Sequence, residues 1–146
     1  MKDKYKKYIE YIVSDIELPY IKSLNMYGLK QEEINLVLSK VFNQPVRLFG
    51  NSIIGEQDKT IYSETWEGYW EIKEYSKEGH LILLKNSSGT IRKWDNEGNA
   101  LYEGRGNGYW ARWEYDDRGN ISLYETSDGV LMVNSKASKT KIRYEL

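Results

Sequence analysis

Seven glycines recur at nearly constant spacing in the second half of the chain, and this repeat constrains the fold more than any other feature. The steps between successive glycines are 11, 10, 9, 10, 11 and 10 residues. A tight turn needs a residue that tolerates positive φ, and glycine adopts that conformation at the lowest cost. The spacing therefore predicts a turn about every ten residues. These glycines are Gly68, Gly79, Gly89, Gly98, Gly108, Gly119 and Gly129.

The segments between these glycines are typical of β-strands. They are rich in β-branched and aromatic residues, and no proline follows Pro45. Turns this close together leave no room for crossover helices, so the strands must pair antiparallel. Alternate glycines share their flanking residues: Gly-Tyr-Trp occurs at Gly68 and Gly108, and Gly-Asn at Gly98 and Gly119. The repeat unit is therefore a hairpin of about 20 residues, and about four copies are predicted.

Two amphipathic helices are predicted before the repeats, over residues 3–17 and 30–42. Apolar residues in both segments recur at the i, i+3, i+4 spacing of one helical face. Pro19 ends the first helix, because the residue before a proline is disfavoured in the α region. Residues 19–28 are predicted to be a linker. Gly55–Lys59 is predicted to be a degenerate first turn of the repeat array.

The sequence thus predicts an α+β fold: two N-terminal helices followed by a long antiparallel β-meander. Two regions are expected, a helical N-terminal cap over residues 1–45 and a hairpin-repeat sheet over residues 46–146. Because each helix has one apolar stripe only, the helices are expected to pack on each other and to cover one end or one face of the sheet.

Charge and composition argue against several functional classes. The chain has 21 basic and 22 acidic residues and no cysteine. Nucleic-acid binding is therefore not expected, because it needs a concentrated basic surface. No run of apolar residues is long enough to span a membrane, and the N-terminal segment lacks the apolar core of a signal peptide. A cytoplasmic location is expected.

Catalysis is not expected, and no catalytic, cofactor-binding or metal-binding residue is predicted. His80 is the single histidine, and it occupies a turn position that holds Asn99 and Asn120 in other repeats. The many carboxylates alternate along the strands and are most simply a solvated face. A paired-carboxylate glycosidase site is the catalytic alternative. The glycine-rich segment 104–108 lies at a hairpin position, so we interpret it as a flexible tip and not as a phosphate-binding loop.

The aromatic residues carry the functional prediction. All five tryptophans and eight of the 13 tyrosines lie in residues 46–146. Two helices cannot cover both sides of such a sheet, so some rings should be exposed. They either stiffen the sheet as cross-strand pairs or form a binding face, since Trp, Tyr and Arg dominate interface hot spots. The predicted binding residues are Trp70, Trp94, Arg105, Tyr109, Trp110, Arg112, Trp113 and Tyr115.

The segment from Gly108 to Asn120, GYWARWEYDDRGN, and the segment from Leu123 to Gly129, LYETSDG, resemble the GYWxxxEYDxxGNxxYYExSxG repeats of small bacteriophage proteins. They are similar, more loosely, to the YD repeats of Rhs-type proteins. The segment 38–46 resembles the helical lead-in that precedes such repeats. The resemblance covers most of the chain, although the second repeat departs from the pattern.

The resemblance implies a non-enzymatic accessory protein of bacteriophage type that binds a host protein. The primary hypothesis is therefore a protein–protein interaction module that inhibits a host or anti-phage defence protein, for example in the manner of an anti-CRISPR. Two alternatives stay open. One is a carbohydrate- or cell-wall-binding module built from aromatic repeats, and the other is a self-associating structural protein that forms homo-oligomers.

Overall fold

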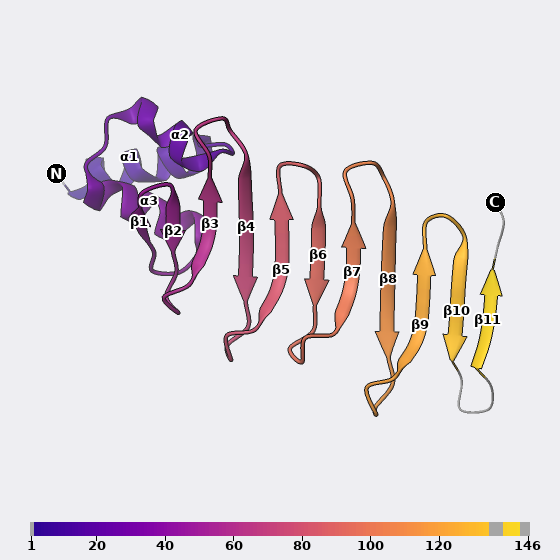
Figure 1. Cartoon of the computed structure of the whole chain (residues 1–146). Helices are drawn as coiled ribbons and strands as arrows, with labels where there is room; N and C mark the ends of the chain where they lie inside the picture. The colour runs from indigo at the N-terminus through magenta and orange to yellow at the C-terminus, as the bar shows by residue number, and fades with distance from the viewer. Residues whose placement is uncertain (1, 135–138, 144–146) are drawn as a thin grey trace. The chain divides into compact units, whose positions relative to one another are not determined.

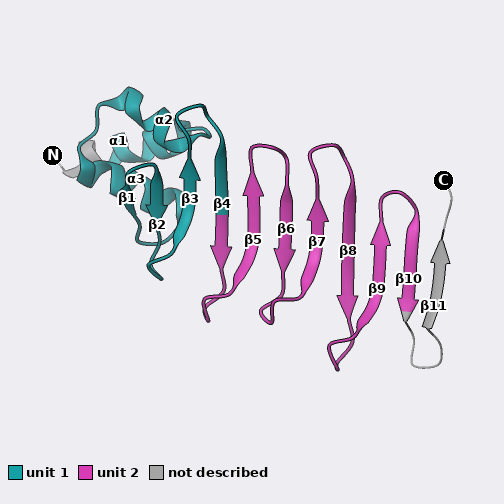
Figure 2. Cartoon of the chain, viewed as in Figure 1, with its two compact units in different colours: residues 1–72 teal, residues 73–146 magenta. Residues whose placement is uncertain are grey.

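The computed structural model describes residues 2–134 and 139–143 of the 146-residue chain. The chain divides into two compact units, Met1–Ile72 and Lys73–Leu146 (Figure 2). Helices are confined to the first part of the chain, and antiparallel strands in chain order follow them (Figure 1). The predicted α+β class and antiparallel meander are confirmed.

Unit 1 contains helices α1 (Lys2–Asp15), α2 (Tyr20–Leu24) and α3 (Gln31–Phe42), with a short 3-10 turn (Asn25–Tyr27) after α2. Helices α1 and α3 match the predicted segments 3–17 and 30–42 to within two residues. Glu33 Oε1 accepts the Lys30 N–H at 2.9 Å and fixes the start of α3. Asn43, in the left-handed conformation with φ of 54°, ends it.

The first four strands are β1 (Arg47–Phe49), β2 (Ser52–Ile54), β3 (Thr60–Glu64) and β4 (Trp70–Tyr75), paired antiparallel in that order. Strand β4 contributes its first residues to unit 1 and its last to unit 2. The turn Gly55–Lys59 has the predicted form, with Asp58 at a φ of 59° in the place that glycine takes elsewhere. Helix α1 contacts α3, and α3 contacts β1, so the predicted pairing of the two helices is confirmed.

The apolar core lies almost entirely in unit 1. Its members come from all three helices and from β2 and β3, apart from Ile16, which follows α1, and Val46, which precedes β1. The buried apolar residues of unit 1 are Ile9, Ile12, Ile16, Ile21, Leu24, Val37, Leu38, Val46, Ile53, Ile61 and Tyr62. Among the described residues of unit 2, Ala111 is the one buried apolar side chain.

Helix α2 lies in the segment that was predicted to be a linker, and that prediction was wrong. The start of α2 is held by a strand distant in sequence: Glu64 accepts the N–H groups of Ile21 at 2.7 Å and Lys22 at 3.1 Å. The hydroxyl of Tyr62 donates to Glu64 Oε1 at 2.7 Å and accepts the Tyr20 N–H at 2.9 Å. Five residues are too few for a helix that is stable alone, so these tertiary contacts form it.

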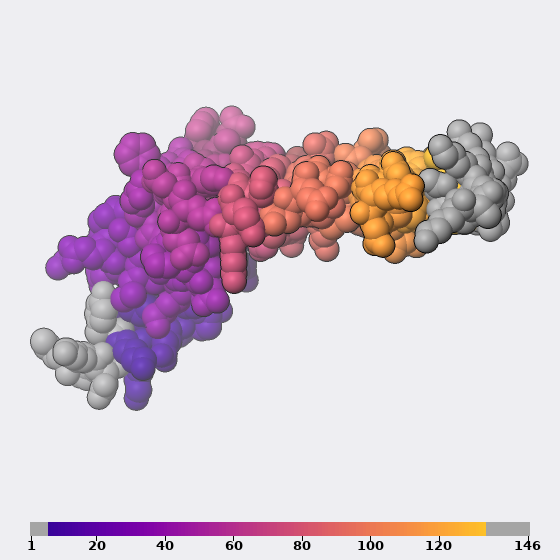
Figure 3. Space-filling model, turned by 90° about the horizontal axis from the view of Figure 1, so that it is seen from below, coloured from indigo at the N-terminus to yellow at the C-terminus, as the bar shows by residue number. Residues whose placement is uncertain are grey.

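Unit 2 contains β5 (Leu81–Asn86), β6 (Ile91–Trp94), β7 (Ala100–Gly104), β8 (Trp110–Tyr115), β9 (Ile121–Thr126), β10 (Val130–Asn134) and β11 (Lys139–Arg143). Each pairs antiparallel with the next. The space-filling view shows the described strands of this unit as one thin layer (Figure 3). Both faces of this layer are therefore partly exposed.

The seven glycine turns share one geometry. In each, the glycine has a φ between 84° and 100°, and its N–H donates to the carbonyl three residues earlier. In six of them the side chain of the first turn residue also accepts backbone N–H groups; Asp95 Oδ1, for example, accepts those of Glu97 and Asn99 at 2.9 Å. The regular glycine spacing thus reflects one turn repeated between successive strands.

Candidate functional site

The strands of unit 2 present two chemically different faces. Side chains alternate along each strand, and directly paired residues share a face. In strand β8 this places Trp110, Arg112 and Glu114 on one face and Ala111, Trp113 and Tyr115 on the other. We call the first the polar face, with members Lys93, Tyr102, Trp110, Arg112, Glu114 and Glu125. The second is the aromatic face, with members Ile82, Trp94, Leu101, Tyr109, Trp113, Tyr115 and Tyr124.

The centre of the aromatic face is a ring pair between adjacent strands. Trp113 of β8 and Tyr124 of β9 are direct partners, with ring centroids 5.3 Å apart and planes inclined by 34°. Burial, and then a hydrogen bond with Tyr109, raise the pKa of the Tyr124 phenol. Ala111, 1% exposed, lies beside this cluster in the same face. Three aromatic rings, from β8, from β9 and from the residue that precedes β8, thus lie together beside a small buried residue.

Arg105 joins this cluster from the turn between β7 and β8. Its guanidinium carbon lies 4.7 Å from the ring centroid of Tyr109, within the range of a cation–π contact. Its Nη2 lies 3.5 Å from Glu103, and Glu103 also pairs with Arg92 at 3.1 Å. Two arginines and one carboxylate therefore border the aromatic rings.

The Arg105 turn differs from the other six. Its first residue has no side-chain acceptor, so Asn107 Oδ1 takes over this role and accepts the Tyr109 N–H at 3.0 Å. The Gly106 backbone packs against the preceding hairpin turn: a Cβ at this position would lie 2.2 Å from the Ser88 carbonyl oxygen. The glycine-rich segment 104–108 was interpreted as a flexible tip, whereas the structure packs it against a neighbour.

The polar face carries Arg112, the second arginine of the predicted site. Arg112 pairs with Glu125 across the strands at 3.3 Å. The Trp110 N–H donates to Ser127 Oγ at 3.0 Å, which ties β8 to the turn after β9. Lys93 places its ammonium 5.9 Å from the ring centroid of Tyr102.

The eight predicted binding residues therefore do not form one surface. Four of them, Trp94, Tyr109, Trp113 and Tyr115, share the aromatic face, and Arg105 borders it. Trp110 and Arg112 lie on the opposite face. Trp70 lies in the unit 1 part of β4, where it pairs with Glu64 of β3. The alternation of side chains along β8 accounts for this division, because Trp110 and Trp113 are three positions apart in the strand.

Two positions on the aromatic face were not predicted. Tyr124 forms the main ring contact of Trp113, and Glu103 links Arg92 and Arg105. Their signal was present in the strand pairing, because Tyr124 lies opposite Trp113 and Glu103 lies opposite Ala111. The pairing of residues between two strands is set by the residues that form the turn of each hairpin. Tyr115 is fixed separately, since its hydroxyl donates to the Ala100 carbonyl at 2.7 Å.

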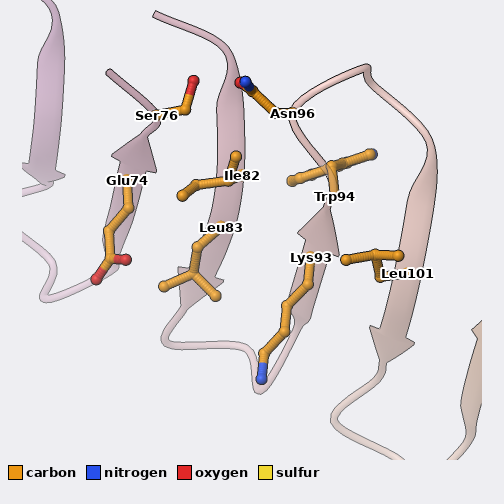
Figure 4. A pocket seen from close by; sticks show the side chains of 8 residues that line it. All are labelled: Glu74, Ser76, Ile82, Leu83, Lys93, Trp94, Asn96 and Leu101. Atoms are coloured by element: carbon orange, nitrogen blue, oxygen red, sulfur yellow. The ribbon is translucent and has the colours of Figure 1, made fainter. Parts of the chain in front are cut away.

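An open depression of about 660 Å³ is lined by residues of strands β4 to β7 and of the turns after β4 and β6. The side chains of Trp94, Leu101 and Ile82 give it an apolar surface, with Glu74 on the other side of Ile82 (Figure 4). Asn96 Nδ2 donates to Glu78 at 2.9 Å, and this hydrogen bond lowers the pKa of the Glu78 carboxyl. The full lining consists of Glu74, Ser76, Ile82, Leu83, Lys93, Trp94, Asn96 and Leu101.

His80 lies in a turn, where its backbone N–H donates to Ser76 Oγ at 3.2 Å. Within the described part of the chain, His, Asp and Glu residues do not gather in groups of three or more that would suit a metal ion. Of the helices in that part, none has both the length and the apolar character needed to cross a bilayer.

The comparisons with known proteins give no match: no protein-family model fits the chain, and no curated protein is significantly similar to it.

Proposed function

We propose that this protein is a non-enzymatic protein–protein interaction module of bacteriophage type that uses the aromatic face of unit 2 to bind and inhibit a host protein. The defence machinery that acts against phages is the partner class we favour. The resemblance to phage repeat proteins motivates this choice of source and target, and the interaction would then take place in the host cytoplasm.

The observation that carries the proposal is the uncovered aromatic face. Trp113, Tyr124 and Tyr109 are half-buried by one another, while within the described part of unit 2 no second layer packs over them (Figure 3). Rings held in this way lose little conformational freedom on binding, and Tyr, Trp and Arg are the residues that dominate interface hot spots. A partner would complete the burial that unit 2 does not provide for itself.

The charges around the rings also suit a protein partner. Arg105 is held over Tyr109 and beside Glu103, so it is oriented before binding occurs. An oriented arginine next to aromatic rings provides both apolar contact and a directed hydrogen-bond donor. The charge of the chain as a whole is nearly balanced, at −1, which disfavours partners that are recognised by a strong opposite charge.

We further infer that the sheet consists of about four hairpin repeats of about 20 residues. Alternate turns carry the same flanking residues, Gly-Tyr-Trp or Gly-Asn, and all seven glycine turns have the same backbone geometry. In such an array each repeat contacts its neighbours only, so the aromatic face extends as repeats are added. Trp94 and Trp113 would then be side chains of successive repeats on one face.

Two variants from a single strand test the proposal. The tagged protein, Trp113→Ala and Trp110→Ala are each used to capture proteins from host lysate. We expect one stoichiometric partner with the wild type and with Trp110→Ala, and none with Trp113→Ala, because these tryptophans lie on opposite faces of β8. Far-UV circular dichroism and thermal unfolding of each variant show whether it is folded.

Loss of the partner with Trp110→Ala and retention with Trp113→Ala would contradict the assignment of the aromatic face. Capture of no protein by a folded wild type would contradict the interaction module itself. Retention of the wild type on purified cell-wall polysaccharide would then support the carbohydrate-binding alternative. A concentration-dependent increase in mass by light scattering would support self-association.

A further inference from the structure

We propose that Arg92 and Arg105 bind the carboxylate of one acidic side chain of the protein partner, at the border of the aromatic face. This inference rests on the proposed function and adds to it the chemistry of one contact. The site consists of two guanidinium groups that Glu103 holds, next to the ring of Tyr109. Nothing in the resemblance to phage repeat proteins assigns this role to these residues.

The strand register places these groups on one side of the sheet. Arg92 of β6 is the direct partner of Glu103 of β7, and Glu103 is the direct partner of Ala111 of β8. Ala111 lies on the same side of β8 as Trp113, because side chains alternate along a strand. Arg105 contacts the Glu103 carboxylate from the turn after β7. One partner surface can therefore contact the charged group and the aromatic rings together.

The two oxygens of the Glu103 carboxylate contact different arginines. Arg92 Nε lies 3.1 Å from Glu103 Oε1, and Arg105 Nη2 lies 3.5 Å from Glu103 Oε2. The side chains of Arg92 and Arg105 are 51% and 57% exposed, whereas that of Glu103 is 22% exposed. Glu103 is therefore the inner member of the group, and both guanidinium groups reach solvent. The cation–π contact with Tyr109 further orients Arg105.

The group carries one uncompensated positive charge. Its two guanidinium groups share Glu103, and neither pairs with a second carboxylate in the described part of unit 2. A guanidinium has five N–H donors, so each arginine keeps donors for a further acceptor. Arg112 on the polar face differs, because Glu125 and Glu114 both lie within ion-pair distance of it, at 3.3 and 3.9 Å. The uncompensated charge is thus specific to the aromatic side of the sheet.

A carboxylate matches this group better than a phosphate does. A carboxylate carries one negative charge, and its oxygens can accept hydrogen bonds from both guanidinium groups. A phosphate monoester carries a charge of about −1.5 to −2 at neutral pH, so Glu103 would repel the excess. A nucleic-acid backbone requires a concentrated basic surface, whereas the chain as a whole has a charge of −1. The charge therefore selects an aspartate or glutamate side chain.

The neighbouring rings determine which side chain accompanies the acidic one. Trp113 lies two residues beyond Ala111 in β8, about 7 Å along the strand, and contacts the ring of Tyr124. Side chains two residues apart in an extended peptide are separated by the same distance. A partner segment that runs along β8 would therefore place an acidic side chain at the arginines and, two residues away, an apolar side chain on Trp113.

The test uses nuclear magnetic resonance of the isotope-labelled full chain, observed at the arginine Nε–H and tryptophan indole N–H signals. The probe is acetyl-Glu-Ser-Phe-amide, and acetyl-Gln-Ser-Phe-amide is its neutral counterpart. Arg92→Gln, Arg105→Gln and Trp113→Ala each identify one signal by its loss. We expect the glutamate peptide to shift all three signals saturably, and the glutamine peptide to leave both Nε–H signals in place.

Arg92→Gln and Arg105→Gln are also the decisive variants. Arg47→Gln is their matched control, because Arg47 is an exposed arginine that pairs with one carboxylate, that of Asp58 in unit 1, at 2.8 Å. We expect each decisive variant to weaken binding of the glutamate peptide about tenfold, as one lost charge-assisted contact implies, and Arg47→Gln to leave it unchanged. Circular dichroism shows whether each variant is folded.

Three results would overturn the proposal: no saturable shift, an equal response to the two peptides, or an equal loss of binding with Arg47→Gln. Inorganic phosphate provides the remaining comparison. Tighter binding of phosphate than of the glutamate peptide at the two arginines would reject the carboxylate and indicate a phosphorylated partner.

The outcome is separable from that of the lysate capture. A partner that depends on Trp113, together with Nε–H signals that ignore the glutamate peptide, would keep the interaction module and reject the acidic contact. Saturable binding of the glutamate peptide by a protein that captures no partner would keep the carboxylate site and reject the interaction module.

Discussion

The carboxylate of Glu64 accepts the backbone N–H of Ile21 at 2.7 Å and thereby connects strand β3 to the start of helix α2. The two residues are 43 positions apart in sequence. Glu64 is 8% exposed and has no cationic side chain beside it in the described structure; three hydrogen-bond donors surround it instead. This is an arrangement in which a buried charge is stabilised by directed hydrogen bonds.

Replacement of Glu64 by alanine is expected to destabilise the protein by about 1–3 kcal/mol, because the buried N–H of Ile21 and the hydroxyl of Tyr62 lose their acceptor. Urea unfolding followed by circular dichroism measures the change. Glu67→Ala, in an exposed turn, serves as the control and should change stability by less than about 0.5 kcal/mol. Equal stability of the two variants would show that the hydrogen bonds of Glu64 contribute nothing.

Gly106→Ala is expected to destabilise the protein by about 1–3 kcal/mol through overpacking. The added Cβ would lie 2.2 Å from the Ser88 carbonyl oxygen, a backbone atom that cannot move without shifting its turn. Asp117→Ala is the matched control, since Asp117 occupies the equivalent second position of an exposed turn. Chemical denaturation of both variants checks the prediction, and an unchanged midpoint for Gly106→Ala would refute the contact between the turns.

Acid is expected to weaken the turn that begins at Asp116. Hydrogen bonds from the backbone, first that of Asn120, hold the pKa of the Asp116 carboxyl below its ordinary value of 3.8. A carboxyl group whose pKa is lower in the folded than in the unfolded state stabilises the fold at pH values above its ordinary pKa. This contribution is lost as the pH falls through the lower, native value.

Asp116→Asn keeps an acceptor oxygen and removes the titration, so the variant should lose less stability than the wild type as the pH falls below 3.8. The urea midpoint measured over a series of acidic pH values gives the comparison. Asp117→Asn, with the same change in charge at the next residue, should follow the wild type. Parallel curves for Asp116→Asn and the wild type would contradict the prediction.

Amide hydrogen exchange is expected to be slowest in unit 1. The amides of Ile12 and Leu38 lie in helices that pack around a buried core, whereas unit 2 buries Ala111 as its one apolar side chain among the described residues. Segments with few buried apolar contacts open at a lower free energy. Exchange followed by mass spectrometry or nuclear magnetic resonance tests this. Strands β5–β10 that exchange as slowly as α1 and α3 would show that unit 2 is stabilised by more than its cross-strand pairs.

The sequence alone determined the regular part of this protein. Apolar periodicity predicted α1 and α3, and the glycine spacing predicted the turns and the antiparallel strands between them. Both are local signals, because a helix face and a positive-φ turn depend on residues close together in the chain. The excess of aromatic residues over what the helices could cover also predicted correctly that rings such as Trp66, 84% exposed, would reach solvent.

Tertiary structure decided the features that depend on contacts between distant residues. Helix α2 forms because Glu64 satisfies its first N–H groups, and a scan for apolar periodicity cannot detect that partner. The close approach of Gly106 to Ser88 depends on two hairpin turns lying side by side. The register of β8 against β9 brings Trp113 to Tyr124 and turns Trp110 to the other face, so strand pairing, and not composition, separates the candidate binding residues into two surfaces.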